Sequence, residues 1–145
     1  MDSDDSVIRV PYQQIPTSSG TKLPVPLVSI GLSHGPVLFK RSFEALVDSG
    51  ADDCVFPTST ARDLGIDLLE ARTERRRGVG GSEQVFIHAV NLHFGPYVIN
   101  IDACFMEHLP ISGLLGRRGF FEHFRITFDP AGSTPGMEFE RVFRS

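Results

Sequence analysis

Residues 45–56 read Ala-Leu-Val-Asp-Ser-Gly-Ala-Asp-Asp-Cys-Val-Phe. Apolar residues flank a short polar loop on both sides, which predicts two buried strands joined by a tight turn. Gly50 allows another part of the backbone to approach this loop closely. A charged carboxylate between two buried strands is costly unless it is hydrogen-bonded or paired. Asp48 is therefore the first candidate for a functional residue, although an Asp that caps a turn is the commoner explanation for such a loop taken alone.

Two further features follow in the chain. Residues 70–77 are charged with only a hint of period two, residues 85–92 alternate in polarity, and Gly78-Val79-Gly80-Gly81 lies between them. This pattern predicts a hairpin with a glycine-rich tip. A strand rather than a helix is expected after these glycines, which argues against a phosphate-binding loop. The second feature is Gly113-Leu114-Leu115-Gly116-Arg117, an apolar pair enclosed by glycines and followed by a cation.

The three features together, in this order and at about this spacing, resemble the retropepsins, the single-domain aspartic proteases of retroviral type. The resemblance extends over about residues 24–128. It implies an all-β fold with two short helices, a closed β-barrel and one lobe per chain. We expect a protease domain over residues 23–128, an N-terminal arm over 1–22 and a C-terminal hairpin strand over 129–145. The helices are expected at residues 60–64, capped by Thr58 or Ser59, and at residues 117–124.

In retropepsins two aspartates share a proton and activate a water molecule for attack on a peptide bond. This chain has one Asp-Ser-Gly and therefore half of such a site. The resemblance implies an aspartic endopeptidase that is a homodimer, with Asp48 from each subunit and a peptide or protein as substrate. Val7–Val10 and Met137–Val142 are the candidate strands for the dimer contact. Two alternatives stay open: a weak or inactive module for dimerisation or peptide binding, and an enzyme that processes one precursor.

The resemblance also assigns roles to other residues of the site. Ser49, Gly50 and Ala51 complete the active-site loop, and Ser49 would hold the partner's loop. Asp52 and Arg117 would form a buried ion pair. The residues expected to contact substrate are Leu46, Asp52, Asp53, Val55, Gly78, Val79, Gly80, Gly81, Ile111 and Leu114. The arginines at 75–77 are expected on a solvated strand, with a preference for acidic substrates as the minority interpretation.

Composition excludes several other functions. The chain has 145 residues, a net charge of −4 and two cysteines. Nucleic-acid binders usually carry a basic excess, and two cysteines with scattered histidines do not make a zinc site. We therefore expect no nucleic-acid partner, no metal and no cofactor, and we expect the thiols to be buried and unreactive. The chain has no apolar run of membrane-spanning length and no signal-peptide pattern at its start, so a cytoplasmic protein without a membrane partner is expected.

Overall fold

A sheet that closes on itself forms the centre of the molecule. The computed structural model describes residues 7–38, 41–78 and 81–143. Its elements are β1 (Val7–Pro11), β2 (Gln13–Pro16), β3 (Lys22–Val25), β4 (Leu27–His34), β5 (Val37–Leu38), β6 (Phe43–Val47), β7 (Val55–Pro57), α1 (Thr58–Asp63), β8 (Arg72–Gly78), β9 (Gly81–Phe94), β10 (Tyr97–Met106), β11 (Leu114–Leu115), β12 (Phe124–Asp129) and β13 (Gly136–Arg141). The expected all-β architecture is confirmed.

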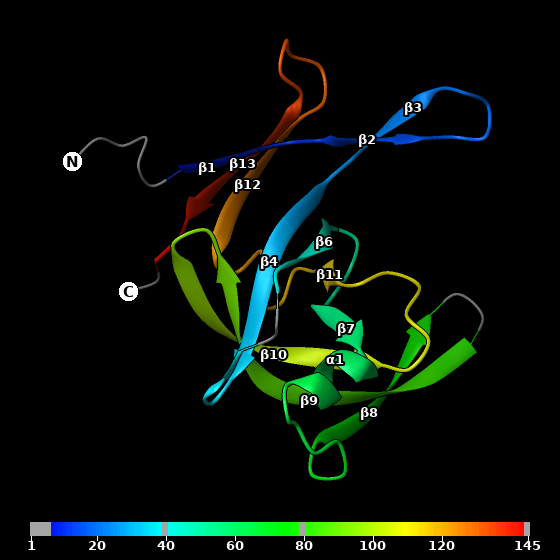
Figure 1. Cartoon of the computed structure of the whole chain (residues 1–145), viewed down its shortest axis with the longest axis vertical. Coiled ribbons are helices and arrows are strands. Elements are labelled where there is room, and N and C mark those ends of the chain that lie inside the picture. Colours follow the sequence, from blue (N-terminus) through cyan, green and yellow to red (C-terminus); the bar gives the residue numbers. More distant parts are fainter. Residues whose placement is uncertain (1–6, 39–40, 79–80, 144–145) are drawn as a thin grey trace.

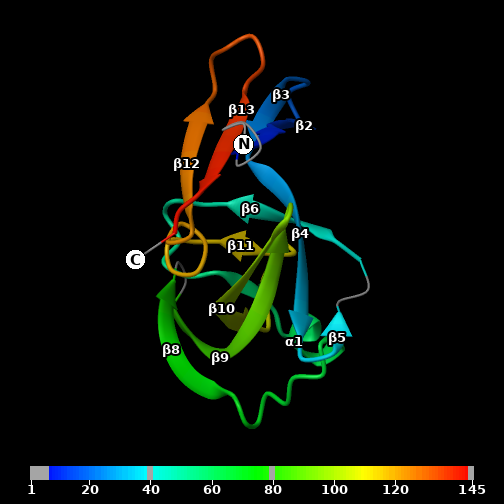
Figure 2. The same ribbon diagram turned by 90° about the vertical axis from the view of Figure 1, so that its left-hand side faces the viewer.

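The main sheet is a closed barrel. Its strand order is β5-β4-β6-β11-β7-β10-β9-β8, and a further pairing of β4 with β9 joins the two sides (Figures 1 and 2). The longest ladder pairs β9 with β10, from Phe94 opposite Tyr97 to Phe86 opposite Phe105. Buried residues alternate along much of β9 and β10, but the buried positions change from odd to even numbers in β9, between Ile87 and Val90. The strand expected at residues 85–92 is present as part of β9.

Aromatic side chains fill much of the core. Phe94 packs edge-on against Phe124 and Phe139, with ring centroids 5.5 and 4.9 Å apart. Phe120 joins the same cluster and is fully buried. Such edge-to-face pairs add to the stabilisation from burial. This cluster connects the barrel to β12 and β13, so the two parts share one core.

A smaller sheet lies beside the barrel and contains both ends of the described chain. Its order is β1-β13-β12, and it projects from the barrel in Figures 1 and 2. β1 pairs with β13 of the same chain, from Val7 opposite Glu140 to Pro11 opposite Gly136. A β2–β3 hairpin, which the sequence did not predict, follows β1. Pro26 separates β3 from β4, because a proline cannot donate a ladder hydrogen bond.

One of the two expected helices is present. α1 begins directly after Pro57 without a side-chain cap, so the capping role expected for Thr58 or Ser59 is wrong. The helix ends before Gly65, which has a φ of +75°. No helix in the described part of the chain is long and apolar enough to cross a membrane.

The helix expected at residues 117–124 is wrong. These residues form turns and an isolated bridge before β12 begins. Gly119 has a φ of +98°, which breaks a helical path. The amide of Glu122 bonds to the carbonyl of Arg117 and the amide of His123 bonds to that of Phe120, at spacings of five and three residues. The repeating four-residue ladder of an α-helix is absent from this described segment.

Candidate functional site

The loop that carries Asp48 is held by β11, which lies between β6 and β7. Leu114 on β11 pairs in parallel with Leu46 and antiparallel with Val55. The amide of Asp48 donates to the Leu115 carbonyl at 3.0 Å. The amide of Gly50 donates to Asp48 Oδ1 at 2.9 Å. Strand pairing and these hydrogen bonds therefore fix both the backbone and the carboxylate of Asp48.

Gly116 allows the segment after β11 to pack directly on the Asp48 loop. A Cβ atom on Gly116 would lie 2.3 Å from the carbonyl oxygen of Asp53 and 2.8 Å from that of Ala51. Such contacts are far inside the van der Waals limit, so only glycine fits. The adjacent amide of Arg117 donates to the Ala51 carbonyl at 2.9 Å. The glycine of the 113–117 motif thus has a steric role in assembling the site.

Arg117 and Asp52 form the expected ion pair, and in the single chain this pair is exposed. Their side chains are 59% and 66% exposed, respectively. At this exposure water screens both charges. An exposed pair of this kind contributes about 0–1 kcal/mol to stability.

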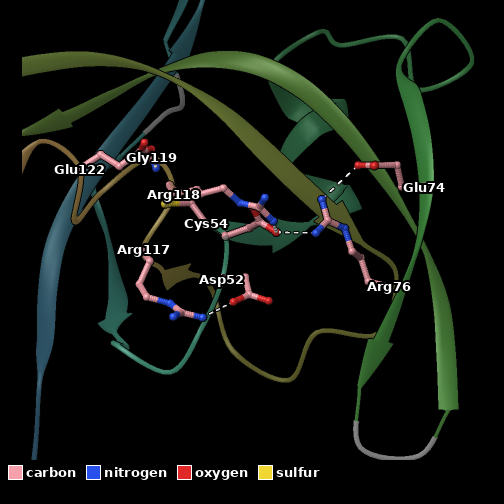
Figure 3. Close-up of polar contacts among 9 residues, drawn as sticks. Asp52, Cys54, Glu74, Arg76, Arg117, Arg118, Gly119 and Glu122 are labelled. Carbon is pink, nitrogen blue, oxygen red and sulfur yellow. Dashed lines mark hydrogen bonds and ion pairs between the residues drawn. The ribbon is translucent and has the colours of Figure 1, made fainter.

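Asp53 belongs to a more buried ionic cluster (Figure 3). Its side chain is 15% exposed and accepts hydrogen bonds from Arg118 Nε at 2.8 Å and Arg118 Nη2 at 3.1 Å. Arg76 Nη1 lies 3.0 Å from Asp53 Oδ2, and Arg76 Nη2 lies 3.0 Å from Glu74. The expectation that the whole 75–77 run is solvated is therefore wrong for Arg76. Alternation along β8 places Glu74 and Arg76 on one face, which was the signal available in the sequence.

A cleft of about 520 Å³ lies beside this loop. Of the residues expected in the active-site loop or at the substrate, the cleft is lined by Ala51, Asp52, Asp53, Val55, Gly81 and Leu114. Asp48, Ser49 and Gly50 precede this wall in the same loop and are not themselves among the lining residues. Leu46 and Ile111 are not among the lining residues; Leu46 is half-buried in β6 and Ile111 is exposed. Val79 and Gly80 lie outside the described residues, and Gly78 ends β8.

The cleft also contains residues that the sequence did not suggest as substrate contacts, apart from the minority interpretation for the arginines at 75–77. They are Arg76, Glu83, Val85, Cys104, Met106, His108, Leu109 and Pro110. Alternation along β9 and β10 puts some of them on one face, but only the barrel closure brings those faces to the Asp48 loop. Among the described residues, no three His, Cys, Asp or Glu side chains are grouped as metal ligands.

The sequence profile of the aspartyl protease family matches residues 35–118, which is more than half of the chain and includes the Asp48 loop and β11. The chain belongs to the aspartyl protease family. No curated protein matches this family member in a sequence search.

Two solved structures are similar to this protease-family chain. One is a retropepsin-like aspartic protease from Rickettsia conorii, 18% identical, with a TM-score of 0.59 over 92% of this chain and 97% of the other. The other is the retroviral protease-like domain of Ddi1 from Leishmania major, 19% identical, with a TM-score of 0.52 over 79% and 94%. At these identities the likeness concerns the fold, and it confirms the retropepsin-like architecture.

Both thiols of the chain are buried. Burial raises the pKa of Cys54 to about 12. Burial and, secondarily, the Asp53 carboxylate raise the pKa of Cys104 to about 11. The thiolate is the nucleophile, so both cysteines are expected to be unreactive near neutral pH, although Cys104 lines the cleft.

We predict that neither thiol reacts with Ellman's reagent in the native protein at pH 8, and that both react after denaturation.

Folding raises the pKa values of both thiols, so the stability of the protein should depend on pH. The contribution of the thiols to the free energy of unfolding is fully present below the unfolded pKa of about 8.5. It is lost as the pH rises from there through about 11 and 12. Urea titrations of wild type and Cys54→Ala at pH 8 and pH 10 check this. The same difference in free energy of unfolding between the two proteins at both pH values would contradict it.

Proposed function

We propose that this chain is an aspartic endopeptidase whose active site forms between two identical subunits, each supplying Asp48. The observation that carries this proposal is the Asp48-Ser49-Gly50 loop, which β6, β11 and β7 hold by strand pairing and which leads directly into the cleft-lining residues 51–53. The sequence contains this motif once, so a pair of such carboxylates requires a second copy of the chain. Ser49 and Gly50 are exposed and are thus available to a partner loop.

The chemistry follows from placing two carboxylates close together. They cannot both ionise easily, so one proton is shared between them. The ionised carboxylate removes a proton from the water molecule while the water oxygen bonds to the peptide carbonyl carbon. The protonated carboxyl group donates its proton to the carbonyl oxygen. Proton transfer to the leaving nitrogen then allows the C–N bond to break. The products are a carboxylic acid and an amine, and no oxidant or reductant is needed.

The cleft suits a peptide with apolar side chains. Its apolar lining is formed by Val55, Val85, Met106, Leu109 and Leu114. Burial of apolar side chains contributes about 25 cal/mol per Å² to binding. Gly81 leaves room for a substrate backbone at the hairpin side of the cleft. For the dimer contact we propose the Asp48 loop together with the terminal sheet of β1, β13 and β12.

The test is cleavage of a diverse peptide pool by the wild-type chain from pH 4 to pH 7, over a range of protein concentrations. We expect cuts flanked by apolar residues, with activity per chain that rises as dimers form. That pH window brackets the titration expected for a coupled carboxylate pair. Absence of cleavage by protein shown to be folded and dimeric would overturn the proposal and favour a peptide-binding module.

A further inference from the structure

We propose that Arg76 is a positioning residue, which ties the β8–β9 hairpin to the Asp53 loop and thereby sets the geometry of the cleft. The proposal rests on the function proposed above. It concerns a contact between two walls of the cleft: Arg76 comes from β8 and Asp53 from the loop that begins at Asp48. Both residues line the cleft.

A side-chain contact can hold this hairpin in place because β8 is an edge strand. It is bonded to β9, and it ends the strand order of the main sheet. β9 pairs with β10 only as far as Phe86, so the part of the hairpin from Glu74 opposite Val85 to Gly78 opposite Gly81 is a two-stranded ribbon. Two-stranded ribbons twist and bend easily. A side-chain contact to another wall is therefore well placed to fix this hairpin.

The contact from Arg76 to Asp53 has the geometry and burial of an effective ion pair. The Arg76 and Asp53 side chains are 33% and 15% exposed. The ion pair of Arg117 and Asp52 in the same loop is 59% and 66% exposed. Screening by water and salt weakens exposed pairs much more than partly buried ones. Figure 3 shows the Arg76 and Arg118 side chains extending toward each other. Both guanidinium groups contact the Asp53 carboxylate.

The same contacts argue against Arg76 as a ligand for acidic substrates. One Nη atom is engaged by Asp53 and the other by Glu74, each at 3.0 Å. Arg76 Nε is buried and has no hydrogen-bond partner among the described residues. The two carboxylates balance the charges of Arg76 and Arg118. A substrate carboxylate would have to displace one of these partners, so a positioning role fits the arrangement better.

Arg76→Met tests the proposal, with Arg75→Met as the matched control. Arg75 is the exposed neighbour on the same strand, and its side chain points to the opposite face. Both variants remove one positive charge from β8 and keep a long side chain. Arg76→Lys restores the charge but not the planar fork that reaches Asp53 and Glu74 together. Steady-state kinetics on one neutral and one acidic cleaved peptide, and hydrogen exchange of the β8 and β9 amides, are measured for all four proteins.

For Arg76→Met we expect KM to rise roughly 5- to 30-fold, which corresponds to losing one partly buried ion pair. We expect kcat to stay within about twofold of wild type, because the reacting groups are unchanged. Amides of the hairpin should exchange faster in Arg76→Met than in Arg75→Met, and Arg76→Lys should be intermediate in both measurements. Arg75→Met should match wild type.

Three results would overturn the proposal. The first is equal hairpin exchange in Arg76→Met and Arg75→Met. The second is an unchanged KM in Arg76→Met. The third is a KM increase confined to peptides with acidic side chains, which would make Arg76 a substrate ligand. If the wild-type chain cleaves nothing, the proposed function fails, while the exchange comparison still decides whether Arg76 holds the hairpin.

Discussion

Asp48→Asn should lower kcat/KM for peptide cleavage by about ten-thousandfold or more, while leaving the fold intact. In a homodimer this single substitution removes both carboxylates, and with them both the base and the acid of the reaction. The fold should persist because an asparagine side-chain oxygen can still accept the hydrogen bond from the Gly50 amide, which is 2.9 Å long with Asp48. Kinetics on the best peptide of the pool, together with thermal unfolding, measure the two effects separately.

Asp63→Asn is the matched control for this variant. It makes the same carboxylate-to-amide change at an exposed position at the end of α1. We expect its kcat/KM to equal that of wild type. Turnover by Asp48→Asn at the level of Asp63→Asn would show that Asp48 does not act in catalysis.

Gly116→Ala should lower the free energy of unfolding by about 3 kcal/mol or more. The added Cβ would lie 2.3 Å from the Asp53 carbonyl oxygen and 2.7 Å from the Asp53 carbonyl carbon. These are backbone atoms, which cannot rotate away as a side chain would. Relief requires a shift of the Asp48–Asp53 loop, so activity should fall with stability. Thermal unfolding should show a Tm roughly 10 °C lower than wild type.

Gly31→Ala controls for the general cost of adding a methyl group to a glycine. Its Cβ would meet the nearest atom, His93 Cβ, at 3.6 Å, which is an ordinary contact. We expect its stability to lie within about 0.5 kcal/mol of wild type. Equal stability of Gly116→Ala and Gly31→Ala would contradict the close packing at Gly116.

The parts of the fold that local patterns encode could be predicted. The apolar runs around Asp48 predict β6 and β7, and the period-two alternation of residues 85–92 predicts β9. The glycines after residue 77 predict the hairpin of β8 and β9. The family resemblance adds the barrel closure, which depends on pairing between β4 and β9 and which no local pattern specifies.

The errors occurred where tertiary contacts override local signals. Phenylalanines and charges at residues 117–124 are compatible with a helix, but Gly119 at a φ of +98° redirects the chain. Three successive arginines indicate a solvated strand, yet the loop around Asp53 provides a partner for one of them. Likewise, spacing alone could not distinguish the exposed Asp52 from the largely covered Asp53, because their environments differ only after β11 and the following turn are in place.

Subunit mixing tests the central claim most directly, namely that one active site uses Asp48 from two chains. Wild-type and Asp48→Asn chains are mixed in equal amounts, allowed to exchange subunits, and assayed against pure wild type at the same total chain concentration. Random pairing leaves about one quarter of the dimers with two Asp48 residues, so the account predicts about one quarter of the wild-type activity. A mixture with Asp63→Asn should keep full activity. Retention of about one half of the activity in the Asp48→Asn mixture would mean that each chain carries a complete site, and would contradict the account.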